Sequence, residues 1–395
     1  MDWQSAVTKE DGTVTIPERW LLLHYYEALN ILFRMENALR VFVYVVLKNK
    51  FHEKWAETSM QTADEEQTTI AGVAARRLAQ ARGFGYLGYE ITSPLMYLNS
   101  GELTNIVCSD SYWNLFKPFF RGKKEIIKNK LDEIGTVRNA LAHFRPIKYD
   151  DIELIKQNMK HAFAGIEQCL TEMTQVHQTV PTNTDGEWYK NLTTLGTNLC
   201  SVQLFQNSSE KWIRCELDYS CAVVRDVGTS HRRLSVTRLI SPVVIKNFPD
   251  LARHCTFMTE YLPYASIRKD KKINITKQLS LIFSKNAIME HHLEIANQIK
   301  DVLLRIETET ELVQKDNLAR GQLIDLVRIS AVLHKSEEAP QWWSINTDNL
   351  KCEFGDSDPP EYWGSIGLLE SDFIAGSVRY PWMPADISKE EEIPF

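Results

Sequence analysis

The chain has 395 residues, of which 44% are hydrophobic and 25% are charged. This composition is typical of a globular protein with room for two or three domains, and ordinary numbers of glycine (17) and proline (14) exclude a collagen-like or largely disordered chain. The net charge of −7 excludes a uniformly basic polyanion-binding protein, although a local basic face is still possible.

The seven cysteines are an odd number without a CxxC pair, which argues against a disulfide framework and a zinc ribbon. The polar residues 1–4 do not begin a signal peptide, because no basic stretch followed by an apolar one is present. The most apolar run, 41–47, is far shorter than the ~20 residues that span a bilayer. We therefore expect a cytoplasmic protein that does not enter a membrane.

Residues 1–180 are predicted to form a first, helical domain. Apolar residues at helical spacing predict a long amphipathic helix over 17–50. Its stripe consists of Leu29, Leu32, Phe33, Leu39, Phe42, Val43 and Val46. A second helix is predicted over 65–82, where Gly83 and Gly85 end it, and irregular chain follows.

Two further helices complete a predicted compact four-helix unit. One covers 123–144 and ends before Pro146. The other begins at Asp150, with Asp150 or Asp151 as its N-cap.

The pattern changes after a linker at 179–186. Alternating Val, Ile, Cys and aromatic residues predict strands over 199–205, 212–224 and 234–245, and helical spacing returns over 275–333. We therefore expect an α+β protein, in which an N-terminal all-α bundle precedes a mixed β/α domain at 181–335. An acidic segment with several aromatic residues, 336–395, ends the chain.

The third predicted helix carries a polar pattern near its end. At ~100° per residue, Val137, Leu141 and Phe144 share one side. Asn139 and His143 are i,i+4 neighbours on nearly the opposite side, with Arg138 beside them. The geometry argues against a core histidine. Three interpretations of His143 are left: a solvent-exposed residue, a cation stabilised by the helix C-terminus, or a functional group.

The functional interpretation of these side chains is phosphodiester chemistry. A histidine can take a proton from a ribose 2′-hydroxyl or give one to a leaving oxygen. An arginine can hold the scissile phosphate with its planar fork of donors. RNA supplies its own nucleophile, so the reaction needs no metal. A two-fold dimer that faces this helix with its copy would place two such pairs in one cleft.

The motif Arg138-Asn139-x-x-x-His143 resembles the Arg-x(4–6)-His motif of the HEPN superfamily, with a polar residue after the arginine. Glu36 and Arg40 match the acidic and basic positions in the first long helix of that family. The resemblance covers roughly 17–180 and implies an all-α, HEPN-like bundle. Many members are metal-independent endoribonucleases that act as homodimers in toxin, abortive-infection and other antiviral systems. Other members bind nucleotides or serve as non-catalytic partners.

The resemblance implies a role for each matched residue. Arg138 would bind and stabilise the phosphate, His143 would be the general base or acid, and Asn139 would position backbone or substrate. Glu36 and Arg40 would orient these groups, although an i,i+4 Glu–Arg pair is also a common exposed helix stabiliser worth about 0.3–0.5 kcal/mol. No cofactor and no metal are expected.

The expected activity is RNA cleavage to 2′,3′-cyclic phosphate and 5′-hydroxyl ends. The second half would then regulate cleavage, by sensing a phage or cellular signal or by docking a partner. The alternative is a non-catalytic HEPN-like module, an antitoxin or scaffold that binds nucleotides or a partner. A third possibility is an enzyme of another kind within 188–335.

A basic window surrounds the motif. Residues 117–148 contain nine Lys or Arg and three acids, a net +6. Such a helix face is often only solvated, but here it predicts RNA binding as well, with Trp113, Phe119 and Phe120 close by in sequence. The candidate RNA-binding residues are Lys123, Lys124, Lys128, Arg145 and Lys148.

The acidity of the chain belongs to its last segment. Residues 336–395 hold thirteen acids and three basic residues, whereas the other 335 residues sum to +3. The net charge of the whole chain is therefore a weak argument against RNA binding. We expect the acidic segment to cover the basic window and restrain the site.

Two other patterns are weaker. Residues 83–88 fit G-x-G-x-x-G, but a helix and not a strand precedes them, so a helix stop and turn is the favoured interpretation. His291 and His292, with Glu290 and Glu294, suggest a metal site only superficially, because adjacent helical positions point in different directions. A solvated helix face is expected there.

Overall fold

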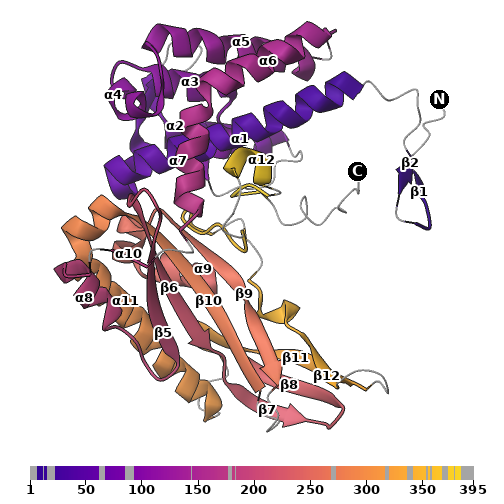
Figure 1. Ribbon diagram of the computed structural model, residues 1–395, viewed down its shortest axis with the longest axis vertical. Helices are drawn as coiled ribbons and strands as arrows, with labels where there is room; N and C mark the ends of the chain where they lie inside the picture. Colours follow the sequence, from indigo (N-terminus) through magenta and orange to yellow (C-terminus); the bar gives the residue numbers. More distant parts are fainter. Residues whose placement is uncertain are drawn as a thin grey trace.

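The computed structural model describes residues 7–11, 13–15, 23–61, 67–84, 93–143, 145–176, 180–182, 184–267, 273–315, 320–335, 341–352, 355, 358–366, 372–377 and 379–383. The fold is α+β, as expected from the sequence. A helical half, residues 23–176, stands on one end of a sheet half, residues 187–352 (Figure 1). Among the helices that are described, none is both long enough and apolar enough to cross a membrane.

The helical half is built around one long helix, α1. The helices are α1 (Leu23–Phe51), α2 (Ile70–Phe84), α3 (Ser100–Cys108), α4 (Trp113–Phe116), α5 (Lys124–Ala142), α6 (Tyr149–Ala162) and α7 (Ala164–Thr174). This half also contains the 3-10 turns η2 (His52–Glu57), η3 (Pro94–Tyr97) and η4 (Lys117–Phe119), and a short hairpin of β3 (Ser59–Gln61) and β4 (Gln67–Thr69). A second hairpin, of β1 (Val7–Thr8) and β2 (Val14–Thr15), precedes the helical half in the chain.

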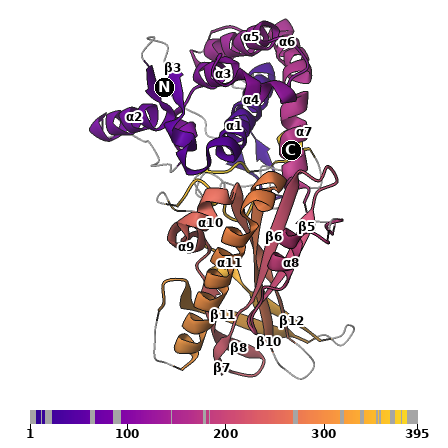
Figure 2. The ribbon, with the colours of Figure 1, turned by 90° about the vertical axis from the view of Figure 1, so that its left-hand side faces the viewer.

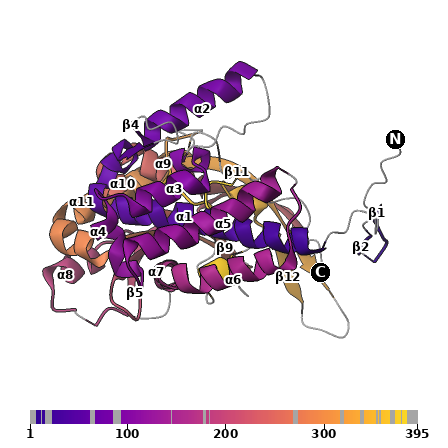
Figure 3. The same ribbon diagram turned by 90° about the horizontal axis from the view of Figure 1, so that it is seen from above.

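Helix α1 passes through the middle of these helices and packs against α3, α5, α6 and α7. Residues 41–47 are buried on every side, which explains why this run is the most apolar of the chain. Helix α2 extends away from the other helices (Figure 2, Figure 3). Leu29 and Phe33, which were predicted to face the core, are 52% and 50% exposed. The predicted stripe of α1 is therefore wrong at its N-terminal end.

The expectation of four helices is also wrong. Helix α3 lies where irregular chain was expected, and it begins with a capping box in which Asn99 and Glu102 bond to each other's backbone N–H groups. The predicted second helix starts later, at Ile70, because β4 precedes it.

The fourth predicted helix is divided, because a break at Phe163 separates α6 from α7. Its N-cap is Lys148, and Asp151 accepts a hydrogen bond from the Lys148 N–H at 2.7 Å. Just beyond the break, a Cβ on Gly165 would lie 1.8 Å from the Phe119 carbonyl oxygen, so only glycine permits this close packing of α7 on η4.

The sheet half contains two antiparallel sheets, with strand orders β5-β6-β10-β9 and β12-β11-β8-β7. The strands are β5 (Cys200–Gln206), β6 (Trp212–Ser220), β7 (Val223–Val227), β8 (His231–Leu239), β9 (Phe257–Ile267), β10 (Ile273–Ser284), β11 (Ile324–His334) and β12 (Trp342–Asn346). Its helices are α8 (Glu187–Thr193), α9 (Ser241–Asn247), α10 (Pro249–His254) and α11 (Lys285–Gln314), with a 3-10 turn η5 (Asp348–Leu350). One more short helix, α12 (Phe373–Gly376), follows the sheet half in the chain.

Helix α11 runs along strands of both sheets (Figure 2). It buries Ile295, Ile299, Val302 and Ile306 against them. Inside this core the Tyr219 hydroxyl contacts the Thr237 hydroxyl at 2.6 Å and the Thr310 hydroxyl at 3.0 Å. The helix and both sheets therefore share one core.

Three predicted elements of the sheet half need correction. The strand expected over 212–224 is two strands, β6 and β7, which belong to different sheets. The strand expected over 234–245 ends at Leu239, because α9 begins at Ser241 with Pro242 in its first turn. The helix expected over 275–333 is helical only in α11. Its flanks form β10 and β11, in which buried and more exposed residues alternate over part of each strand.

The last segment is divided between the two halves. Its strand β12 pairs with β11 in the sheet half, whereas α12 packs on α1 and α7 of the helical half (Figure 1). The Arg34 guanidinium donates to the carbonyl oxygens of Ile374, Ala375 and Ser377 at 3.0–3.1 Å. The Trp382 ring packs edge-on against Tyr44, at a centroid distance of 5.3 Å. The expected position over the basic window is therefore wrong for these residues, which cover α1 and α7 instead.

The two halves meet in a packed junction. Trp212, Phe257 and Ile282 of the sheet half belong to the same apolar core as the helices. The Tyr44 hydroxyl donates to the carbonyl oxygen of Thr256 at 2.7 Å, and the Thr256 hydroxyl donates to the Asn49 side chain at 3.0 Å. This continuity fixes how the end of α1 approaches α10 and α11.

Candidate functional site

Arg138 belongs to a charged cluster between α5 and α1. Its Nε lies 3.4 Å from Oε2 of Glu36, and the other oxygen of that carboxylate pairs with Nη2 of Arg40. The Glu36 and Arg40 side chains are 15% and 11% exposed, whereas Arg138 is 35% exposed. One carboxylate thus holds two guanidinium groups, and Arg138 is the one that reaches the surface.

Arg40 is anchored inside this cluster. Its Nη1 donates to the Asn37 side chain and its Nη2 to the Leu98 carbonyl oxygen, both at 3.1 Å. Burial lowers the pKa of Arg40, with Arg138 adding to the effect and Glu36 opposing it. The guanidinium still keeps its proton in a protein. The pair is only 11–15% exposed and therefore differs from the common exposed helix stabiliser.

Changing Glu36 tests how the cluster is held. Glu36→Gln leaves the Arg40 charge buried without its counterion, so the free energy of unfolding should fall by about 3 kcal/mol. Urea denaturation of both proteins measures this loss. Glu153→Gln on α6 is the matched control, because Glu153 is 52% exposed and pairs with Lys156 in solvent, where screening leaves such a pair little effect on stability. Equal losses in the two variants would contradict the prediction.

Asn139 and His143 both lie on the solvent side of α5. The helix ends at Ala142, and the His143 N–H donates to the Asn139 carbonyl oxygen at 3.1 Å as the C-cap residue. The side chains of both residues are exposed, whereas Val137 and Leu141 are buried, as the helical spacing predicted. Phe144 lies outside the described residues.

The structure therefore brings together most of the residues that the motif singled out. Arg138 Nη1 is 3.3 Å from the Asn139 side-chain oxygen, and Glu36 joins Arg138 to Arg40. His143 follows one turn later, at the exposed helix end. An arginine and an imidazole that both reach solvent at one helix end can contact a phosphodiester and exchange a proton with it.

The candidate RNA-binding side chains are mostly free to meet a ligand. Lys123, Lys128, Arg145 and Lys148 are exposed around α5, whereas Lys124 pairs with Asp110. The nearby aromatic rings are not available for stacking on bases. Trp113 stacks on Phe120, and both Phe119 and Phe120 pack edge-on against Phe42 in the core.

Two hollows lie near these elements. Glu36 and Arg138 line a small pocket between α1, α3 and α5, together with Ser100 and Thr104. A separate cleft of about 940 Å³ lies between the halves, and its charged and imidazole lining includes Lys50, His52, Arg121, His161, Lys211 and Glu290. The larger hollow is therefore separate from the Arg138–His143 motif on α5, and residues from both halves of the chain line it.

The remaining motifs have different outcomes. Residues 85–88 of the G-x-G-x-x-G pattern lie outside the described residues, and Gly83 is still helical in α2. The seven cysteines are all described and are free thiols. The expected solvated face at His291 is wrong, because its ring stacks on that of His254. Sequence spacing could not show this contact, because His254 is distant in the chain and only the tertiary fold places it there.

No family model, no curated protein and no solved structure matches this chain.

Proposed function

We propose that the protein is a metal-independent endoribonuclease of the HEPN type, with its site at the end of α5. The observation that supports this most is the link through Glu36. This residue joins Arg138, on the motif helix, to Arg40, its predicted partner on the first long helix. The order of α1, α5 and α6 also follows the HEPN pattern. We place the enzyme in the cytoplasm, in antiviral defence, abortive infection or a toxin system.

The proposed reaction uses only RNA and these side chains. His143 takes the proton of a ribose 2′-hydroxyl, whose oxygen attacks the adjacent phosphorus. The bond from phosphorus to the 5′-oxygen breaks, and that oxygen takes a proton from the second His143 imidazole, which the proposed dimer supplies. Arg138 binds the phosphate and offsets the charge that develops on it. The products are a 2′,3′-cyclic phosphate and a 5′-hydroxyl.

A homodimer through the helical half would complete the site. Tyr26, Leu29 and Phe33 form an apolar stripe on α1 that is about half exposed and ends one turn before Glu36. An exposed stripe of this kind favours contact with a second apolar surface, and a two-fold copy supplies the same one. Sedimentation of the active protein measures the state, and cleavage by a strictly monomeric protein would refute the composite site.

Analysis of the RNA products tests the activity itself. We expect cleavage of total RNA in the presence of EDTA, with 3′ fragments that a kinase can label at once because they carry 5′-hydroxyl ends. The 5′ fragments should end in a 2′,3′-cyclic phosphate. An adapter should therefore not ligate to their 3′ ends until an enzyme has opened the cyclic phosphate and removed it. Fragments with 5′-phosphate ends, or cleavage that appears only with added Mg²⁺, would contradict the proposal.

One observation favours the alternative, a non-catalytic module that binds nucleotides or a partner. The Glu36 carboxylate pairs with the Arg138 guanidinium. Its negative charge offsets the positive charge that would otherwise attract a phosphate. In this case the protein would bind RNA or a nucleotide without cutting it, and its expression would not arrest growth. The sheet half would regulate the site in either case, through a ligand or a phage trigger.

A further inference from the structure

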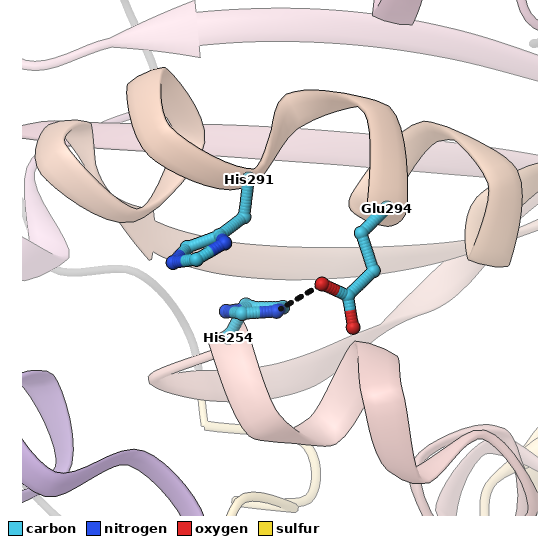
Figure 4. A group of neighbouring side chains, drawn as sticks. All are labelled: His254, His291 and Glu294. Carbon is cyan, nitrogen blue, oxygen red and sulfur yellow. Dashed lines mark ion pairs between the residues drawn. The ribbon is translucent and has the colours of Figure 1, made fainter.

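Three possible metal ligands gather between α10 and α11 (Figure 4). His254 ends α10, and His291 and Glu294 lie three residues apart on α11, so their side chains share one face. One ligand atom from each lies within 4.8 Å of the other two. The His254 and His291 rings stack at a centroid distance of 4.2 Å.

His254 is a buried imidazole with a carboxylate beside it. Its side chain is 2% exposed, and Nε2 lies 3.2 Å from Oε2 of Glu294 in an ion-pair contact. The other ring nitrogen, Nδ1, is buried without a hydrogen-bond partner. Buried polar atoms are nearly always satisfied in proteins, and a cation bound to the ring would satisfy this one.

The backbone departs from ordinary geometry at two neighbouring histidines. His291 has φ −127° and ψ 21° within α11, where no proline or glycine accounts for the kink. His52, the first residue after α1, has φ +52°. Its ring centroid lies 5.7 Å from that of His254 and 6.1 Å from that of His291. The positive φ of His52 is uncommon for a residue other than glycine, and such conformations cluster at functional sites.

The surroundings orient the carboxylate and make the site acidic. Arg253 lies 3.3 Å from Oε1 of Glu294, which leaves Oε2 toward the histidines. Glu53 and Asp250 also pair with Arg253, and Glu290 lies 3.9 Å from His291. Three carboxylates thus share the Arg253 guanidinium and a fourth lies near His291, and a divalent cation would reduce this excess of negative charge.

We propose that this cluster binds one zinc-like divalent ion, with His254, His291 and Glu294 as ligands and His52 as the fourth. Imidazole and carboxylate are ordinary zinc ligands in a tetrahedral site, and two imidazoles on one ion have centroids roughly 5 Å apart. The distances from the His52 ring centroid to those of His254 and His291, 5.7 and 6.1 Å, are already close to this separation. The rings of His254 and His291 rotate out of their stacking when the ion binds.

The ion would join the two halves of the chain. His52 belongs to η2 of the helical half, and the other three ligands belong to α10 and α11 of the sheet half. His52 and Glu290 also line the cleft between the halves, so the ion would stabilise one end of that cleft. The inference is independent of RNA cleavage, because no residue of the α5 site takes part.

Zinc titration of the full-length protein without a histidine tag tests the site. We expect one Zn²⁺ per chain by calorimetry and by elemental analysis, a higher melting temperature with Zn²⁺, and the visible absorption of tetrahedral Co²⁺ after substitution. His254→Ala, His291→Ala and Glu294→Gln should each weaken binding at least about 100-fold. His292→Ala, at the adjacent position, and His231→Ala, at the exposed first residue of β8, should leave binding unchanged.

Further outcomes decide against the proposal. Wild-type protein that binds no Zn²⁺ would overturn it, and so would His291→Ala and Glu294→Gln variants that bind as wild type does. These two side chains are partly exposed, so their variants serve even where His254→Ala does not fold. Unchanged affinity in His52→Ala would overturn the assignment of the fourth ligand and the link between the halves.

Discussion

Arg138→Ala and His143→Ala are each expected to abolish RNA cleavage while the protein stays folded. Loss of the group that stabilises a developing charge typically costs about 10²–10³ in rate, and loss of a general acid or base about 10²–10⁴. Both side chains reach the surface, so neither truncation opens a cavity. Single-turnover cleavage of a labelled RNA measures the rates, and circular dichroism and melting temperature report the fold.

Matched variants separate chemistry from binding. Lys160→Ala and His231→Ala remove a positive charge or an imidazole at other exposed positions and should leave the rate unchanged. Lys123→Ala and Lys128→Ala should lower the affinity for RNA and make it less dependent on salt. The rate of cleavage at saturating RNA should change less. Wild-type rates in either Arg138→Ala or His143→Ala would refute the assignment of the site.

The variant Arg138→Lys tests whether the planar guanidinium, with its two parallel donors, is required at this position or whether a positive charge is enough. Lysine keeps the charge but cannot make two parallel hydrogen bonds to a phosphate. We therefore expect cleavage to stay well below that of the wild type, with RNA affinity largely kept. Recovery of the full rate would show that only charge matters at this position.

Lys277→Met is expected to cost about 3–5 kcal/mol of stability. The Lys277 ammonium and the Glu260 carboxylate are both fully buried, with Nζ 2.8 Å from Oε2. Nζ also donates to the carbonyl oxygens of Leu239 and Leu350, at 2.8 and 3.0 Å. Methionine has a similar length but leaves the carboxylate buried and unpaired. Urea denaturation gives the loss directly.

The double variant Lys277→Met/Glu260→Gln is the matched control. A glutamine oxygen can still accept the Cys352 N–H, which now donates to Glu260 at 2.8 Å, and no charge is left buried. The double variant should therefore be more stable than Lys277→Met alone. Additive losses would show that the two residues do not act as a pair. Lys351→Met, at an exposed ion pair, should change stability by less than about 1 kcal/mol.

Local patterns in the sequence predicted several elements over which one periodicity extends. Helix α5 is an example, because it lies within the predicted span 123–144 and its Ile127, Leu131, Ile134, Val137 and Leu141 are all buried at helical spacing. The same reasoning failed where the period changes without a strong break, as between β10 and α11. A window that spans both elements averages the two periods, so the strand was assigned to the helix. Helix α3 was missed although Asn99 and Glu102 mark its start.

The candidate site on α5 was accessible to sequence reasoning because its residues come from two helices with recognisable motifs. The structure adds the contact of Glu36 with Arg138, which joins those motifs in space. The last segment was different. Its acidity predicted a charge contact with the basic window, whereas its buried aromatic residues and the Arg34 hydrogen bonds hold it on α1 and α7. Burial of aromatic area outweighs screened surface charge.

The sequence by itself determined the α+β class, the amphipathic face of α5 and the polar residues at its end, because these depend on periodicity within one element. Only the tertiary structure decided which distant side chains meet. Glu36 reaches Arg138 because α1 packs on α5, and His52, His254 and His291 meet because the end of α1 is held against α10 and α11. A pattern along one chain records spacing, whereas a binding site depends on the packing of separate elements, which no local period encodes.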